Sequence, residues 1–199
     1  MSEVQSLTGR LLLAMPGMGD PRFDCAVIAM CVHDSQGALG IGIGKLHPGL
    51  RFRQILGNVG LDPGVAPDAP VHNGGPVETQ RGFILHSPEW RCDDTIMVEG
   101  QYGLSASLEA LRAITRGEGP TRWVFALGYA GWGPGQLDGE MQRHGWYAAE
   151  TFRQRWWYAF PCPSSPKHYP FFALNPESVY STRCFCPPPN AQQTRLFYP

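Results

Sequence analysis

The sequence has few charged residues and very little lysine. Asp, Glu, Lys and Arg together make up 17% of its 199 residues, whereas a typical soluble domain has roughly 25%. Lysine occurs only at Lys45 and Lys167, and the formal net charge at pH 7 is −1. Such a chain lacks the positive field of a nucleic-acid-binding protein and the cationic face of a protein that binds a membrane surface. We therefore expect no direct contact with nucleic acid or with a membrane.

Long hydrophobic runs are also missing. The longest run near the N-terminus covers residues 11–15, whereas a transmembrane helix needs about 20 apolar residues and a secretory signal roughly 7 to 15. We therefore expect a cytoplasmic protein, in which the six cysteines are thiols rather than disulfides.

The chain divides into two parts of different composition. Residues 1–150 contain 11 basic and 16 acidic residues, whereas residues 151–199 contain five basic residues and one acidic residue, Glu177. The second part also holds 9 of the 19 prolines and 12 of the 23 aromatic residues. Its proline clusters exclude helices and central strands. We therefore expect a domain at 1–150 and an atypical tail at 151–199, which is either poorly ordered or an out-of-frame reading of the gene.

Within residues 1–150, short apolar segments alternate with segments of helical periodicity. The pattern predicts strands at 8–15, 24–32, 38–44, 81–86, 95–98 and 121–128, and helices at 51–57, 105–116 and from 137 to about 145. Ser105 or Ser107 can cap the helix at 105–116, and Gly117 can end it. Because turns join the early strands, the pattern favours a mixed α/β or α+β domain over a doubly wound parallel sheet.

Two glycine-rich segments are candidate binding loops. The first is Gly74-Gly75-Pro76, whose glycines suit a positive φ or a close approach to another segment. The second covers residues 128–135 and is expected to turn from a strand into a helix, where backbone N–H groups could face an anion. It matches neither a dinucleotide-binding nor a phosphate-binding motif, so a packed turn is the alternative interpretation.

The histidines and cysteines offer an enzymatic alternative. The six histidines show no metal-binding spacing, and we expect neither a metal nor a cofactor. His33 with Asp34, or His86 at a strand end, could serve in acid–base catalysis, although a structural histidine is the commoner case. Arg91 could activate the thiol of Cys92. A small hydrolase or a thiol-redox enzyme is therefore the alternative to a binding protein.

Four blocks of the sequence resemble the YqgE/AlgH family of bacterial proteins. They are Leu13-Ala14-Met15-Pro16-Gly17-Met18; His33 with Gly37-Ala38-Leu39-Gly40; Gly74-Gly75-Pro76-Val77 with Gly82-Phe83-Ile84-Leu85-His86; and residues 127–137 with Glu140 and Trp146. The blocks follow the family's order over about residues 7–150, and the tail does not match. The resemblance implies a single compact α/β domain with a mixed, branched sheet flanked by helices. It also implies a cytosolic protein, and some members of the family are labelled transcriptional regulators.

These observations predict a non-enzymatic binding or regulatory domain. Its working surface is expected where the two glycine-rich segments meet, and the candidate residues are Gly74, Gly75, Pro76, His86, Tyr129, Trp132 and Gln136. The aromatic side chains would supply contact area, and the amide of Gln136 a hydrogen bond. The sequence leaves open whether the ligand is a small molecule or a protein partner, and it does not fix the oligomeric state.

Overall fold

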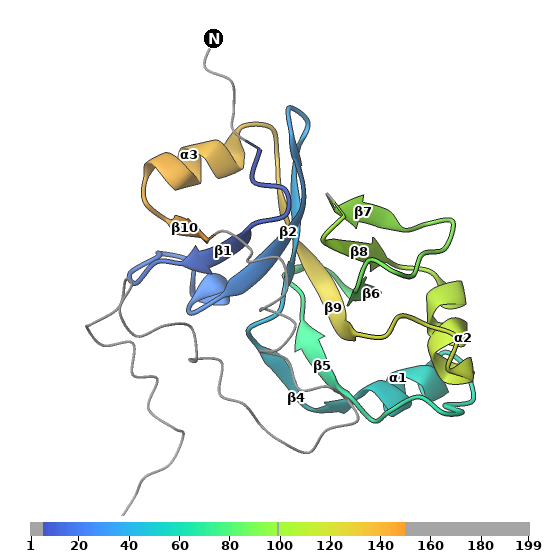
Figure 1. Cartoon of the computed structure of the whole chain (residues 1–199). Helices are drawn as coiled ribbons and strands as arrows, with labels where there is room; N and C mark the ends of the chain where they lie inside the picture. Colours follow the sequence, from blue (N-terminus) through green and yellow to red (C-terminus); the bar gives the residue numbers. More distant parts are fainter. Residues whose placement is uncertain (1–5, 99, 150–199) are drawn as a thin grey trace, which may run out of the picture.

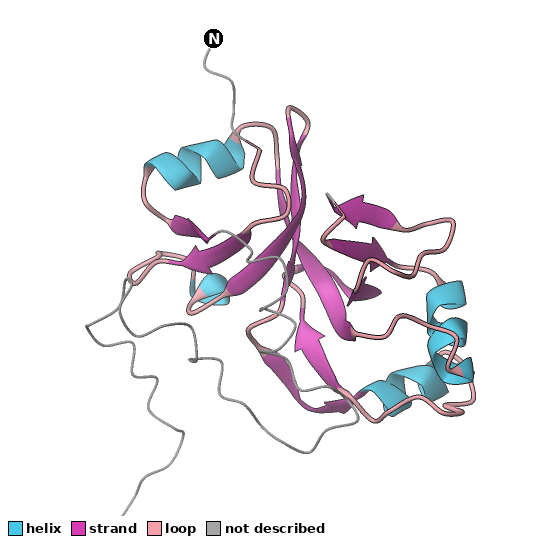
Figure 2. Cartoon of the chain, viewed as in Figure 1, coloured by secondary structure: helices cyan, strands magenta, loops and turns pink. Residues whose placement is uncertain are grey.

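The computed structural model describes residues 6–98 and 100–149, so the interpretation of residues 151–199 lies outside the described part of the chain. Within that part, ten strands form one large twisted sheet with three α-helices packed against it (Figures 1 and 2). A short 3-10 helix, η1, spans Pro21–Phe23. The predicted α+β domain with a mixed sheet and flanking helices is thus confirmed.

Eight strands form a continuous row in the order β10-β1-β2-β3-β9-β6-β8-β7. All neighbouring pairs in this row are antiparallel. The strands are β1 (Leu11–Ala14), β2 (Val27–Asp34), β3 (Gly37–Gly42), β6 (Val77–His86), β7 (Ile96–Val98), β8 (Tyr102–Ser105), β9 (Trp123–Trp132) and β10 (Trp146–Ala149).

The sheet branches along β9. Residues 125–127 of this strand pair in parallel with β5 (Pro70–Asn73), whereas residues 130–132 pair with β3. β6 pairs with the other side of β9 along residues 123–127 and, through Val77, at Tyr129. β4 (Leu46–Arg51) extends the branch by pairing with β5. Between the two stretches lies Gly128, with a φ of 75°. The branched sheet that the family resemblance implies is therefore present.

The helices cover the two ends of the sheet. α1 (Phe52–Asn58) and α2 (Leu108–Arg116) lie together at one end, and α3 (Gln136–Gln142) packs near β1 and β10 at the other (Figure 1). The side chain of Ser107 caps α2, and Gly117 ends it in the left-handed conformation, as the sequence predicts. Within the described residues, no helix has the length and apolar character needed to cross a membrane.

The largest departure from the sequence-based expectation concerns β9. Its glycines predict a turn from residue 128, but the strand continues through Trp132 and the chain turns only at residues 133–135. Because side chains alternate across a strand, this extension directs Ala130 and Trp132 to the same, buried face. The strands β4, β5, β8 and β10 are also absent from the prediction, because each is short and lacks a clear alternation of apolar and polar residues.

Candidate functional site

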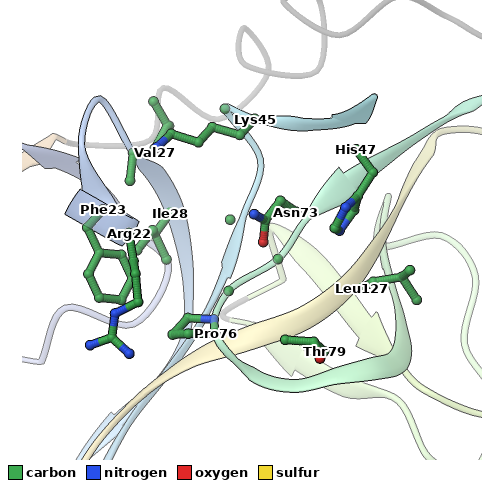
Figure 3. Close-up of a pocket in the computed structure, with 15 residues that line it drawn as sticks. Arg22, Phe23, Val27, Ile28, Lys45, His47, Asn73, Pro76, Thr79 and Leu127 are labelled. Atoms are coloured by element: carbon green, nitrogen blue, oxygen red, sulfur yellow. The ribbon is translucent and has the colours of Figure 1, made fainter. Parts of the chain in front are cut away.

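A cavity of about 270 Å³, here called the branch cavity, opens where β5 and β3 diverge from β9 (Figure 3). Its wall is mostly apolar, and the apolar side chains belong to Phe23, Ala26, Val27, Ile28, Pro76 and Leu127. Backbone of four glycines completes the wall, at positions 42, 44, 74 and 75. Small-molecule sites are typically concave, mainly apolar and furnished with a few polar groups, and the branch cavity has this character.

The two glycine-rich segments meet beside the cavity, but they do so through their backbones. The N–H of Gly74 donates to the carbonyl of Leu127 at 2.8 Å, and the carbonyl of Gly74 accepts from Gly42 at 2.7 Å. A Cβ at Gly74 would overlap the carbonyl oxygen of Gly128, and one at Gly75 would overlap the backbone of Tyr129. These glycines are therefore required by packing at the branch of the sheet.

Five polar side chains line the branch cavity: Arg22, Lys45, His47, Asn73 and Thr79. The guanidinium of Arg22 is bound to the carboxylate of Asp20, 2.6 Å away, and it points away from the centre of the cavity in Figure 3. Lys45 forms no ion pair within the described residues. No acidic side chain from the described part of the chain lines the cavity. The wall therefore carries one cation without a counter-charge.

His47 supplies an unusual polar group. Its Nε2 atom is buried and has no hydrogen-bond partner in the described part of the chain. Buried polar atoms are nearly always paired in folded proteins, so an unpaired one requires an explanation. The ring hangs inward from β4 in Figure 3.

Of the candidate residues, Gly74, Gly75 and Pro76 line the branch cavity, whereas the other four do not. Trp132 is only 6% exposed and belongs to the core cluster beneath α3. Its ring packs against those of Phe23 and Trp146, and its Nε1–H donates to the carboxylate of Glu140 at 2.9 Å. Trp132 is therefore a core residue, and the expectation that it forms contact surface is wrong.

Gln136 is exposed, but its amide is hydrogen-bonded within the protein. Its side-chain oxygen accepts from the N–H of Gly133 at 3.1 Å, and its side-chain nitrogen donates to Glu140 at 2.9 Å. Both ends of the amide are thus engaged where α3 begins. The partly buried ring of Tyr129 packs edge-on against Phe83, with 5.7 Å between ring centroids.

His86 is completely buried and lies in a separate polar cluster. Its Nδ1 lies 3.0 Å from the carbonyl of Ser87, and because a carbonyl can only accept, Nδ1 carries the proton. Nε2 then accepts from the hydroxyl of Ser105, 3.0 Å away, which in turn accepts from Thr95 at 2.7 Å. Burial lowers the pKa of His86 and favours the neutral ring. This Ser–His arrangement has the connectivity of a nucleophile and its base.

Access distinguishes this cluster from an active site. Ser105 is 1% exposed and His86 is fully covered, so no substrate reaches the hydroxyl in this conformation. Cys92 lies at the edge of the cluster, with its Sγ 3.8 Å from Ser105 and donating to the carboxylate of Asp94 at 2.9 Å. No contact between Arg91 and the thiol is present among the described residues.

His33 and Asp34, the candidates for acid–base catalysis, have different partners. The buried ring of His33 accepts from the N–H of Leu7 through Nδ1 at 3.1 Å, and its Nε2 faces Asp138 at 3.6 Å. Asp34 instead accepts from the N–H of Gln36 at 2.7 Å and closes the turn between β2 and β3. Across the described residues, no group of three or more His, Cys, Asp or Glu side chains could hold a metal ion.

Lys45, His47 and Asn73 line the cavity although the sequence did not suggest them as site residues. One available signal was that Lys45 is the only lysine in residues 1–150. A second was the spacing of Lys45 and His47, which places both side chains on the same face of an extended chain. That signal requires an extended segment at residues 45–47, and the local pattern does not predict a strand there.

Comparison with known proteins places the chain in a family. A model of the AlgH-like family (DUF179) matches residues 11–161, somewhat beyond residue 150, where the sequence resemblance ends. A UPF0301 protein of Novosphingobium aromaticivorans is 66% identical over 150 residues, which cover 75% of this chain and 81% of that protein. A UPF0301 protein of Rhizorhabdus wittichii is 57% identical over 151 residues, covering 76% and 81%.

Two solved structures share the fold. The solution structure of AlgH from Pseudomonas aeruginosa is similar with a TM-score of 0.65 and 35% identity, covering 76% of this chain and 80% of that one. A crystal structure of a protein from Corynebacterium diphtheriae has a TM-score of 0.61 at 19% identity, covering 77% and 80%, and its likeness concerns the fold alone. On the family match and on these identities, the chain belongs to the AlgH-like family, whose relatives bear the name UPF0301.

Proposed function

We propose that this protein is a non-enzymatic cytosolic domain that binds a small molecule in the branch cavity. The observation that carries the proposal is the unpaired, buried Nε2 of His47 in the wall of an otherwise largely apolar cavity. A ligand that accepts a hydrogen bond from this atom would remove the cost of leaving it unpaired, about 1–3 kcal/mol for a buried polar group.

The chemistry of the wall supports binding rather than catalysis. Among the described residues that line the branch cavity, none carries a carboxylate, a thiol or a serine hydroxyl. The Ser105–His86 pair belongs to a different, covered cluster. Such a domain would act because its ligand-bound and ligand-free forms interact differently with a partner. On this basis we propose a regulatory role. The acidic composition of residues 1–150 argues against direct recognition of DNA.

Native mass spectrometry of the full chain, purified from a bacterial cytoplasm, tests the proposal. The wild type is compared with Thr79→Trp, which fills the cavity from its rim, and with Gln80→Trp. Thr79 lines the cavity, whereas Gln80 is the next residue of β6, is exposed and does not line it, so the second variant is a matched control for added bulk.

The expected result is a retained mass on the wild type and on Gln80→Trp that is absent from Thr79→Trp. The mass should be on the order of 200 Da, since the cavity lies just below the usual size range of ligand pockets. Retention by Thr79→Trp would place the ligand elsewhere. If all three proteins showed only the mass of the polypeptide, and the protein did not respond to the probes described below, the proposal would be refuted.

A further inference from the structure

We infer that the branch cavity is built for a small organic monoanion, a carboxylate with a short apolar body. The carboxylate lies between Lys45 and His47, and the body packs on the apolar wall. This inference rests on the proposed function and specifies the ligand class of the same site.

The charge of the ligand follows from the ion pairs. Two side chains of fixed positive charge, Arg22 and Lys45, line the cavity, and the carboxylate of Asp20 neutralises Arg22. Lys45 has no such partner in the described part of the chain, and the cavity wall there carries no acid. One unbalanced cation beside a mainly apolar wall matches one negative charge, because a second charge would enter the cavity without a partner.

The position of the carboxylate follows from the backbone. The N–H of Asn73 donates to the carbonyl of Lys45 at 2.9 Å, and Leu46 pairs with His72, so residues 45–47 run extended beside β5. Lys45 and His47 both line the cavity, whereas Leu46 between them is 52% exposed. A carboxylate has two oxygens, one for the ammonium of Lys45 and one for Nε2–H of His47.

The apolar body follows from the rest of the wall. Ile28 is buried, and Phe23, Pro76 and Leu127 are partly buried beside it. In Figure 3 the ring of His47 lies on one side of the cavity with Ile28 and Pro76 across from it, and the side chain of Lys45 extends along the upper edge toward Val27. A ligand that presents its charge to β4 therefore places its apolar end against β2 and the loop before β6. A free inorganic anion would leave this apolar wall uncovered.

Benzoate and benzyl alcohol provide a direct test, because they have nearly the same shape and differ in charge. Each is titrated into the ¹⁵N-labelled full chain, and the amide signals of Gly74 and Gly75 report binding at the cavity. Four proteins are compared: the wild type, Lys45→Met, His47→Phe and Arg81→Met. Arg81 is exposed, pairs with Glu78 and does not line the cavity, so Arg81→Met controls for the change in net charge.

The expected result is that wild-type protein binds benzoate with a Kd of about 1 mM, which is reasonable for so small a ligand. Benzoate should bind roughly tenfold to a hundredfold more tightly than benzyl alcohol, since hydrogen bonds to charged groups are among the stronger ones. Lys45→Met should abolish this preference, His47→Phe should weaken benzoate binding several-fold, and Arg81→Met should change neither.

The outcomes separate this inference from the proposed function. Equal binding of the two probes at the glycine amides would overturn the anion inference and leave the proposed binding cavity standing. A preference for benzoate that survives in Lys45→Met would also overturn the inference, because another group would then hold the charge. Absence of any shift at Gly74 and Gly75 with either probe, at concentrations well above the expected Kd, would overturn the inference, and together with no retained mass in the native experiment it would also refute the proposed function.

Discussion

His72 should make the stability of this domain fall in mildly acidic solution. The side chain is buried on β5, and its Nδ1–H donates to the carbonyl of Ile43 at 2.9 Å. Burial lowers the pKa of His72 to about 4 in the folded protein, and the hydrogen bond to Ile43 offsets this only in part. In the unfolded chain the pKa returns to about 6.5.

The sign and size of the effect follow from these two values. Below pH 6.5 His72 is protonated in the unfolded chain but remains neutral in the folded protein. The free energy of unfolding therefore decreases as the pH falls toward 4, and His72 changes it little at lower pH. The difference between the two pKa values corresponds to about 3 kcal/mol in total, of which about 2 kcal/mol is lost between pH 7 and pH 5. That loss is a large fraction of the stability of an ordinary domain.

Urea denaturation of wild type and His72→Asn at several pH values measures this contribution. Asparagine retains a side-chain N–H for the carbonyl of Ile43 and does not titrate, so the variant should lose stability by a constant amount at neutral pH. The difference in the free energy of unfolding between the two proteins should then decrease by about 2 kcal/mol from pH 7 to pH 5. Acidic groups titrate equally in both proteins and cancel in the comparison.

A matched control is His144→Asn, because His144 is exposed and its φ of 56° is one that asparagine tolerates. Its stability should follow the wild type at every pH. If the free energies of unfolding of wild type and His72→Asn changed in parallel with pH, His72 would be protonated about as easily in the folded as in the unfolded chain. That result would refute the argument from burial.

Three further predictions concern the core, the branch of the sheet and the thiol. Glu140→Ala removes the acceptor of the indole N–H groups of both Trp132 and Trp146 and should lower the free energy of unfolding by about 3 kcal/mol in urea; a loss below about 0.5 kcal/mol would mean that water replaces the carboxylate. Gly74→Ala should leave no folded protein by circular dichroism, whereas Gly57→Ala in α1, where a Cβ meets nothing within 4 Å, should be neutral or stabilising by up to about 1 kcal/mol. Equal stability of these two alanine variants would contradict the packing argument. Cys92 should react with iodoacetamide more slowly than free cysteine at neutral pH, because its side chain is partly buried and its thiol donates a hydrogen bond to Asp94. Faster reaction would support the alternative of a thiol enzyme.

The sequence predicts well the elements whose signals are local. The periodicity of residues 105–116, with a serine before it and Gly117 after it, correctly predicts α2 and its cap. The alternation in residues 38–44 and the turn before it correctly predict the β2–β3 hairpin. In each case the residues that define the element are also the ones that stabilise it.

The candidate site was harder to predict because its determinants are distant in sequence. Position 74 requires glycine because a Cβ there would overlap the carbonyl oxygen of Gly128, 54 positions later. The strand β4 forms because it pairs with β5. No local pattern records such pairings. Gly74, Gly128, Trp132 and Gln136 are among the most noticeable residues of the sequence, and the structure employs them in packing and hydrogen bonding around β9 and α3.

The glycines and the branch cavity nevertheless have a common cause. A strand that changes partners, as β9 does from β5 to β3, forces three backbones close together, and only glycine fits at that point. Beyond it the strands diverge, and the branch cavity is lined by residues of both β2 and β5. The glycines thus serve packing at the branch, whereas Lys45 and His47 supply polar groups to the cavity wall. A mutation at the glycines should therefore act on folding, and a mutation at Lys45 or His47 on the choice of ligand.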